Sequence, residues 1–100
     1  MIEAIADFNG KLKRIDELIT MLMPFNLDSK NYIYNSELIA RIVNELESCV
    51  DSADKLADEH PLLNSLSSWN TDKNKIRETI GVTRYALELA KHVDPNDPSL

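Results

Sequence analysis

Apolar side chains recur along this chain at alternating steps of three and four residues, which is the spacing of one face of a helix. The first such run extends from Ile2 to Met23 and contains Ile5, Phe8, Leu12, Ile15, Ile19 and Leu22. Pro24 ends the run, because proline lacks the amide hydrogen that a helix interior requires. The pattern predicts a long helix over residues 2–23 that packs on other helices.

A second run begins after Asn35 and Ser36, two residue types that favour the N-cap position of a helix, and it ends at Pro61. Its apolar seam consists of Ile39, Ile42, Leu46, Cys49, Ala53, Leu56 and His60, flanked by Leu38, Val43, Val50 and Ala57. A third run follows helix-start residues at 70–72 and places Ile76, Ile80, Thr83, Leu87 and Ala90 on one face, beside Val82, Ala86 and Val93. These runs predict long helices over residues 36–60 and 72–93.

We therefore predict an all-α fold, a small bundle of three long helices, because no segment alternates apolar and polar residues as strands do. A chain of 100 residues suffices for one core, so residues 1–93 should form a single domain. The segment PLLNSLSSW, residues 61–69, is either a short fourth helix or an apolar loop over one end of the bundle. Residues 94–100 contain two prolines and no periodicity, and we expect a flexible C-terminal tail there.

The connection between the first two predicted helices, PFNLDSKNYIYN, is longer than the roughly 2–8 residues usual in helical bundles. It carries Phe25, Tyr32 and Tyr34, half of the six aromatic residues. These side chains either cover the core or form a binding loop, in which tyrosine offers a large contact area with a polar tip. Tyr32 and Tyr34 are therefore candidate partner-binding residues.

The charge of the chain favours a basic partner over nucleic acid. Seventeen acidic and eleven basic residues give a net charge of −6, whereas nucleic-acid binding needs clustered lysine and arginine. Residues 37–60 alone contain seven acidic and two basic residues, a net charge of −5. Nearly all of the imbalance thus lies in the second predicted helix.

Four of these acids, Glu47, Asp51, Asp54 and Asp58, follow one another at steps of four, three and four, and we call them the acidic ridge. Measured against the apolar seam, they occupy positions that should point farthest from the packed face. We therefore predict that the acidic ridge faces solvent. Together with the neighbouring Glu59, it is the main candidate surface for a basic protein partner.

Motifs for catalysis or metal binding are absent from the sequence. The chain contains neither a glycine-containing calcium loop nor a Glu-x-x-His motif of a dinuclear carboxylate site, and its two glycines exclude a phosphate-binding loop. Carboxylates on an outer helix face lack the burial that raises the pKa of a catalytic acid. Cys49 lies on the apolar seam, so we expect it to be buried and unreactive. No cofactor and no metal ion are expected.

One pair of residues resembles the catalytic pair of a known enzyme family. Arg84 and His92 share the third predicted helix, in a manner that resembles the arginine and histidine of small HEPN ribonucleases. The seven residues between them exceed that family's spacing, and Tyr85 stands where the family has a polar residue after the arginine. An enzyme of this type is therefore the last-ranked alternative.

These observations together predict a protein-binding module without enzymatic activity. In acidity, size and helicity the chain resembles the small immunity and antitoxin proteins that neutralise basic bacterial nuclease toxins by direct binding. A lone cysteine, a start without a secretion signal and the lack of an apolar run of about 20 residues predict a cytoplasmic protein that does not enter the membrane. We expect it to be a monomer.

The main alternative is a self-associating or adaptor bundle. Its contact surface would be the apolar residues that follow Pro61, namely Leu62, Leu63, Leu66 and Trp69. Such a cluster could pack on a second copy or on a larger assembly. The oligomeric state separates this alternative from the inhibitor hypothesis.

Overall fold

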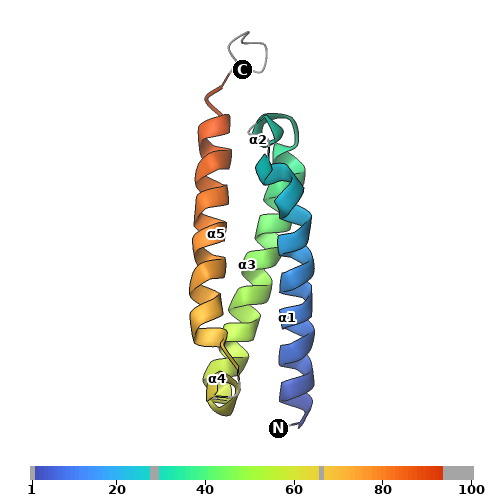
Figure 1. Cartoon of the computed structure of the whole chain (residues 1–100), viewed down its shortest axis with the longest axis vertical. Coiled ribbons are helices and arrows are strands. Elements are labelled where there is room, and N and C mark those ends of the chain that lie inside the picture. The colour runs from blue at the N-terminus through green and yellow to red at the C-terminus, as the bar shows by residue number, and fades with distance from the viewer. Residues whose placement is uncertain (1, 28–29, 66, 94–100) are drawn as a thin grey trace.

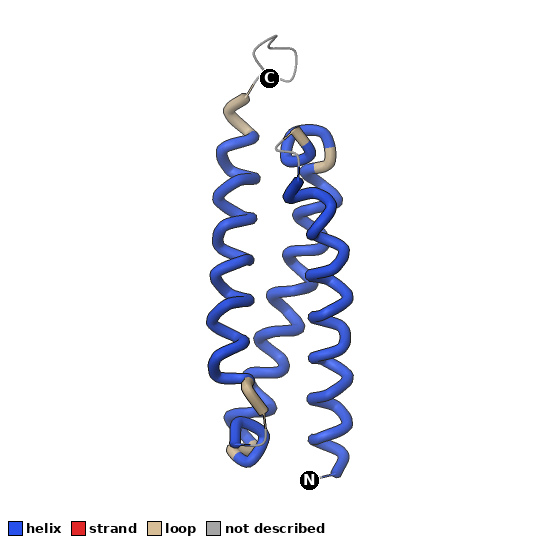
Figure 2. The backbone as a smooth tube through the Cα atoms, viewed as in Figure 1, coloured by secondary structure: helices blue, strands red, loops and turns tan. Residues whose placement is uncertain are grey.

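The computed structural model describes residues 2–27, 30–65 and 67–93, and nearly all of them are helical (Figures 1 and 2). The elements are, in chain order, α1 (Ile2–Leu22), the 3-10 helix η1 (Met23–Leu27), α2 (Asn31–Tyr34), α3 (Ser36–Glu59), α4 (Leu62–Ser65) and α5 (Trp69–Ala90). Within these ranges there is no strand, so the prediction of an all-α bundle with three long helices is confirmed. None of the described helices is long and apolar enough to cross a membrane.

The three long helices lie side by side, with α3 between α1 and α5 (Figure 1). Consecutive long helices run in opposite directions, so the start of α1, the end of α3 and the start of α5 share one end of the bundle. The helices α1 and α5 contact each other little, and both pack mainly on α3. The central helix therefore has two packing neighbours, and this determines which of its side chains are buried.

The buried residues of α3 include much of its predicted apolar seam and also residues that flank the seam. The helix α3 contributes half of the buried apolar side chains, namely Ile39, Ile42, Val43, Leu46, Val50, Ala53 and Ala57. Val43, Val50 and Ala57, which we predicted to flank the seam, are fully buried, whereas the seam residue Cys49 is only half-buried. The reason is that α3 packs on α5 as well as on α1, which rotates and broadens its buried face.

The two flanking helices depart from their predicted seams in similar ways. In α1 the buried residues include Leu18, which lies off the seam, while Leu12 and Ile19 on the seam are half-buried. In α5 Ile80 is buried, as predicted, but Val82 is exposed. A regular apolar spacing thus identified each helix, but the direction of its neighbours decides the exact buried set.

The segment after Pro61 forms a short helix, α4, so the helical alternative is the correct one. Leu63 is buried, and so is Trp69, which begins α5 three residues earlier than predicted. The Trp69 ring meets Phe8 of α1 edge to face, with 5.6 Å between ring centroids. Leu63 and Trp69 therefore close the core, whereas Leu62 is exposed and Leu66 lies outside the described residues.

The long connection between α1 and α3 is also helical, in η1 and α2, which the sequence did not indicate. Phe25 and Tyr32 are half-buried and pack against the core, so these two aromatics do cover it. Tyr34 is 63% exposed. The predicted tail, residues 94–100, lies outside the described part of the chain.

Candidate functional site

The acidic ridge is not a uniform solvent-facing surface. Asp54 lies at the contact between α3 and α5, where its Oδ1 atom accepts hydrogen bonds from Lys73 Nζ at 2.9 Å and from the Trp69 indole Nε1 at 3.2 Å. The side chain of Asp54 is only 24% exposed. One member of the predicted docking surface thus serves as an acceptor for the beginning of α5.

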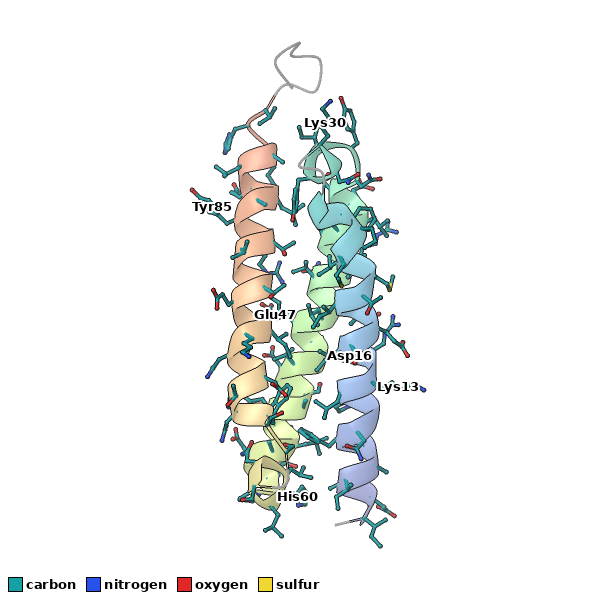
Figure 3. All side chains as sticks on the ribbon, in the orientation of Figure 1. Lys13, Asp16, Lys30, Glu47, His60 and Tyr85 are labelled. Carbon is teal, nitrogen blue, oxygen red and sulfur yellow. The ribbon has the colours of Figure 1, made fainter. Side chains whose placement is uncertain are left out.

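Two more ridge residues pair with α5. Arg77 Nη1 donates to Asp51 Oδ1 at 3.1 Å. The Nη2 atom of the same side chain lies 3.5 Å from Asp54 Oδ2. Arg84 Nη2 donates to Glu47 Oε1 at 3.2 Å and to Asn44 Oδ1 at 3.1 Å. Glu47, Asp51 and Asp54 together with Lys73, Arg77 and Arg84 form an α3–α5 ion-pair ladder, and Figure 3 shows Glu47 on the side of α3 that faces α5.

The prediction that the acidic ridge points away from the packed face is therefore wrong for Glu47 and Asp54, which are half-buried. These acids face the basic residues Lys73, Arg77 and Arg84 of α5. The physical reason is that a heptad pattern defines the outer face of a helix relative to a single packing partner. Because α3 has two partners, the side of its seam that should be free lies against α5.

The ladder changes the protonation of Asp54. The hydrogen bond from Lys73 lowers the pKa of this carboxyl below its ordinary value, while partial burial acts in the opposite direction and the Trp69 hydrogen bond lowers it further. Asp54 is therefore ionised at neutral pH and is engaged on several sides. Such a carboxylate suits a structural role better than proton transfer, which needs a pKa near the working pH.

Asp58 and Glu59 differ from the rest of the predicted surface. Both are exposed, and neither has an ion-pair partner among the described residues. They lie in the last turn of α3, next to α4, whose Leu62 is 58% exposed, at the end of the bundle marked by His60 in Figure 3. We call Asp58, Glu59 and Leu62 the acidic end of the bundle.

The two candidate tyrosines occupy the opposite end, on α2. Tyr32 and Ile33 line a cleft of about 630 Å³ between α2, α3 and α5, with Ala40 on one wall and Leu87 and Ala90 on the other. Burial raises the pKa of Tyr32. Tyr34 is exposed outside this cleft, so the structure does not bring the two tyrosines into one site. No pattern in the sequence indicates the cleft, because the cleft depends on the separation of two helices.

The remaining chemical candidates are Cys49, Arg84 and His92. Burial raises the pKa of the Cys49 thiol, and the Glu45 carboxylate adds to the effect, so the thiolate is disfavoured. Cys49 is half-buried, which is more exposed than we predicted. Arg84 belongs to the ladder, and His92 is exposed beyond the end of α5. In the described part of the chain no three His, Cys, Asp or Glu residues are grouped so that they could hold a metal ion.

A comparison with protein-family models, curated proteins and solved structures finds no significant match to this chain.

Proposed function

We propose that this chain is a protein-binding module, and more narrowly an acidic inhibitor of the immunity or antitoxin type that neutralises a basic nuclease toxin in the cytoplasm. The observation that carries the proposal is the position of Asp58 and Glu59, which are exposed and unpaired within the described structure at the end of α3. Because the ladder occupies Glu47, Asp51 and Asp54, the proposed docking surface is now the acidic end instead of the whole ridge.

The acidic end is costly for the fold, which supports a role in binding. The C-terminal end of a helix carries a partial negative charge, so acidic residues there are unfavourable and basic residues favourable. The last turn of α3 contains Asp58 and Glu59 and no basic residue. Local features that oppose the fold are concentrated at functional sites in natural proteins.

The surroundings of the two carboxylates suit a protein partner. Exposed carboxylates that are not neutralised speed the encounter with a basic surface. Leu62 beside them is exposed and can bury its side chain at the centre of a contact, where interfaces are most apolar. A basic cleft that binds phosphate, such as the active site of a nuclease, has the complementary charge.

Co-purification from the native host tests this proposal. The tagged chain should retain a basic protein, and that protein should cleave nucleic acid when alone and lose this activity when the chain is added back at equal concentration. Retention of a partner that is neither basic nor a nuclease would refute the inhibitor proposal. If the chain retains its partner equally well after substitution of Asp58 and Glu59, the proposed surface is refuted.

A self-associating bundle is the second candidate, and a different observation favours it. Val82, Tyr85 and Leu89 lie on one face of α5 at steps of three and four, and each is at least half exposed. Tyr85 points away from the bundle (Figure 3). Sedimentation equilibrium decides between the candidates, because self-association through this face predicts a dimer that Tyr85→Glu dissociates, whereas the inhibitor proposal predicts a monomer.

A further inference from the structure

The exposed face of α5 carries a regular row of residues, which we call the outer seam. Its members are all exposed and follow one another at alternating steps of three and four residues: Lys75, Glu78, Val82, Tyr85, Leu89 and His92. His92 lies just beyond the end of α5, where its backbone amide donates to the Leu89 carbonyl and continues the turn. Such a spacing is typical of a helix that packs on another helix.

The middle of the outer seam is apolar. Val82, Tyr85 and Leu89 are 62%, 68% and 50% exposed, and they succeed one another on the same face of the helix. Tyr85 points away from the bundle, so this face is open to a second molecule (Figure 3). Single exposed apolar residues are ordinary on a protein surface, whereas a contiguous group of them marks a contact surface.

A glycine lies beside these apolar residues. Gly81 is exposed, its φ is not positive, and a Cβ atom at this position would meet no heavy atom of the chain within 4 Å. Neither the backbone conformation nor the packing of the chain thus requires glycine, although glycine is less favourable than alanine inside a helix. A missing side chain does allow another helix or side chain to approach the backbone closely.

We propose that the outer seam binds the outer seam of a second copy of the chain, with the two α5 helices antiparallel. This inference rests on the self-associating bundle, the second candidate function. In a packed helix pair, each seam residue inserts into a hole formed by four residues of the facing helix. One such hole on the outer seam is formed by Glu78, Gly81, Val82 and Tyr85. Tyr85 of the second copy inserts there, because Gly81 leaves room for its ring.

The charges of the outer seam favour the antiparallel direction. Parallel helices would place Glu78 against Glu78 and Lys75 against Lys75, and like charges that face each other across a contact are unfavourable. In the antiparallel pair, residues 89–92 of one copy lie beside Lys75 and Glu78 of the other. The His92 imidazole can then donate a hydrogen bond to the Glu78 carboxylate. Within the described part of the chain neither of these two side chains has an ion-pair partner.

Cysteine cross-linking tests the direction. In a Cys49→Ala background, Glu78→Cys and Leu89→Cys are oxidised separately and as an equimolar mixture. We expect disulfide-linked dimers chiefly in the mixture, because antiparallel helices place position 78 of one copy against position 89 of the other. Lys55→Cys, at an exposed site on α3, is the control and should not cross-link.

The possible failures of this experiment are distinguishable. Efficient cross-linking of each variant with itself would show parallel helices and would overturn the inference, while self-association itself would stand. A wild-type protein that remains a monomer in sedimentation equilibrium would refute both the second candidate function and the inference that rests on it.

The close approach at Gly81 is tested by Gly81→Ala, with Gly10→Ala in α1 as the matched control, since Gly10 is also exposed and has no heavy atom within 4 Å of a Cβ position. Gly81→Ala should raise the Kd of the dimer at least about tenfold, because the added methyl group fills the space that Tyr85 of the second copy occupies. Gly10→Ala should leave this Kd unchanged. An unchanged Kd for Gly81→Ala, or an equal rise in both variants, would overturn the proposed packing.

Discussion

Asp54 belongs to the acidic ridge, but its carboxylate takes part in the contact between α3 and α5. Its Oδ1 atom accepts hydrogen bonds from an ammonium and an indole that both belong to the beginning of α5. The Trp69 ring is buried, and a buried indole N–H requires an acceptor. Asp54 therefore supplies the acceptor that allows Trp69 to close the core, and its charge is balanced by Lys73.

We predict that Asp54→Asn lowers the free energy of unfolding at neutral pH by about 1.5–3 kcal/mol, the range for a hydrogen bond to a charged group. Because the pKa of Asp54 is lowered in the folded state, its stabilising effect is present above the ordinary carboxyl pKa of 3.8 and is lost as the pH falls through the lower folded value. Urea unfolding from pH 7 to pH 3 should therefore show a smaller acid-dependent loss in the variant. Asp51→Asn, at a more exposed ladder residue, is the control and should cost at most about 1 kcal/mol.

Leu46 tests the assignment of the core at the scale of one side chain. It is fully buried in α3, and truncation of such a leucine leaves a cavity. Leu46→Ala should lower the free energy of unfolding by about 2–5 kcal/mol. Leu38 on the same helix is 45% exposed, so Leu38→Ala should cost clearly less. Similar losses in both variants, measured by urea unfolding, would mean that the buried face of α3 is misassigned.

At the scale of the elements, the sequence predicts well which long helices exist but predicts poorly which of their faces are buried. The spacing of apolar residues identified α1, α3 and α5 within three residues at each end, because each helix must bury a continuous stripe. The same spacing could not show that α3 lies between two helices. The positions of Glu47 and Asp54 depend on that arrangement, so a ridge that would be free on an isolated helix becomes part of a helix–helix contact. The helices η1 and α2 were missed because they are short and lack a regular apolar spacing.

The end of α3 provides a prediction at this scale. Asp58→Asn combined with Glu59→Gln removes two negative charges from the negative end of the helix dipole without changing side-chain size. The free energy of unfolding should rise by about 0.3–1 kcal/mol for each of the two charges, the usual effect of a charge near a helix end. Asp16→Asn with Glu78→Gln, which neutralises two exposed carboxylates away from a C-terminal helix end, is the control and should produce no comparable gain. Chemical denaturation at low ionic strength measures the difference.

In the whole molecule, the acidic ridge and Glu59 fall into two groups. Glu47, Asp51 and Asp54 attach α5 to the bundle, whereas Asp58 and Glu59 remain available at one end. The sequence shows the net charge and its concentration in one helix. It could not divide that charge between the fold and a partner, because the division depends on which carboxylates α5 reaches.

We propose that Asp58 and Glu59 bind a basic partner at some cost to the fold. Calorimetric titration of the purified partner with wild-type protein, with Asp58→Asn/Glu59→Gln and with Asp16→Asn/Glu78→Gln measures this binding. We predict at least about a tenfold rise in Kd for the first variant, equivalent to 1.4 kcal/mol, and a Kd near that of the wild type for the control. An unchanged Kd for Asp58→Asn/Glu59→Gln, or an equal rise in both variants, would contradict the claim.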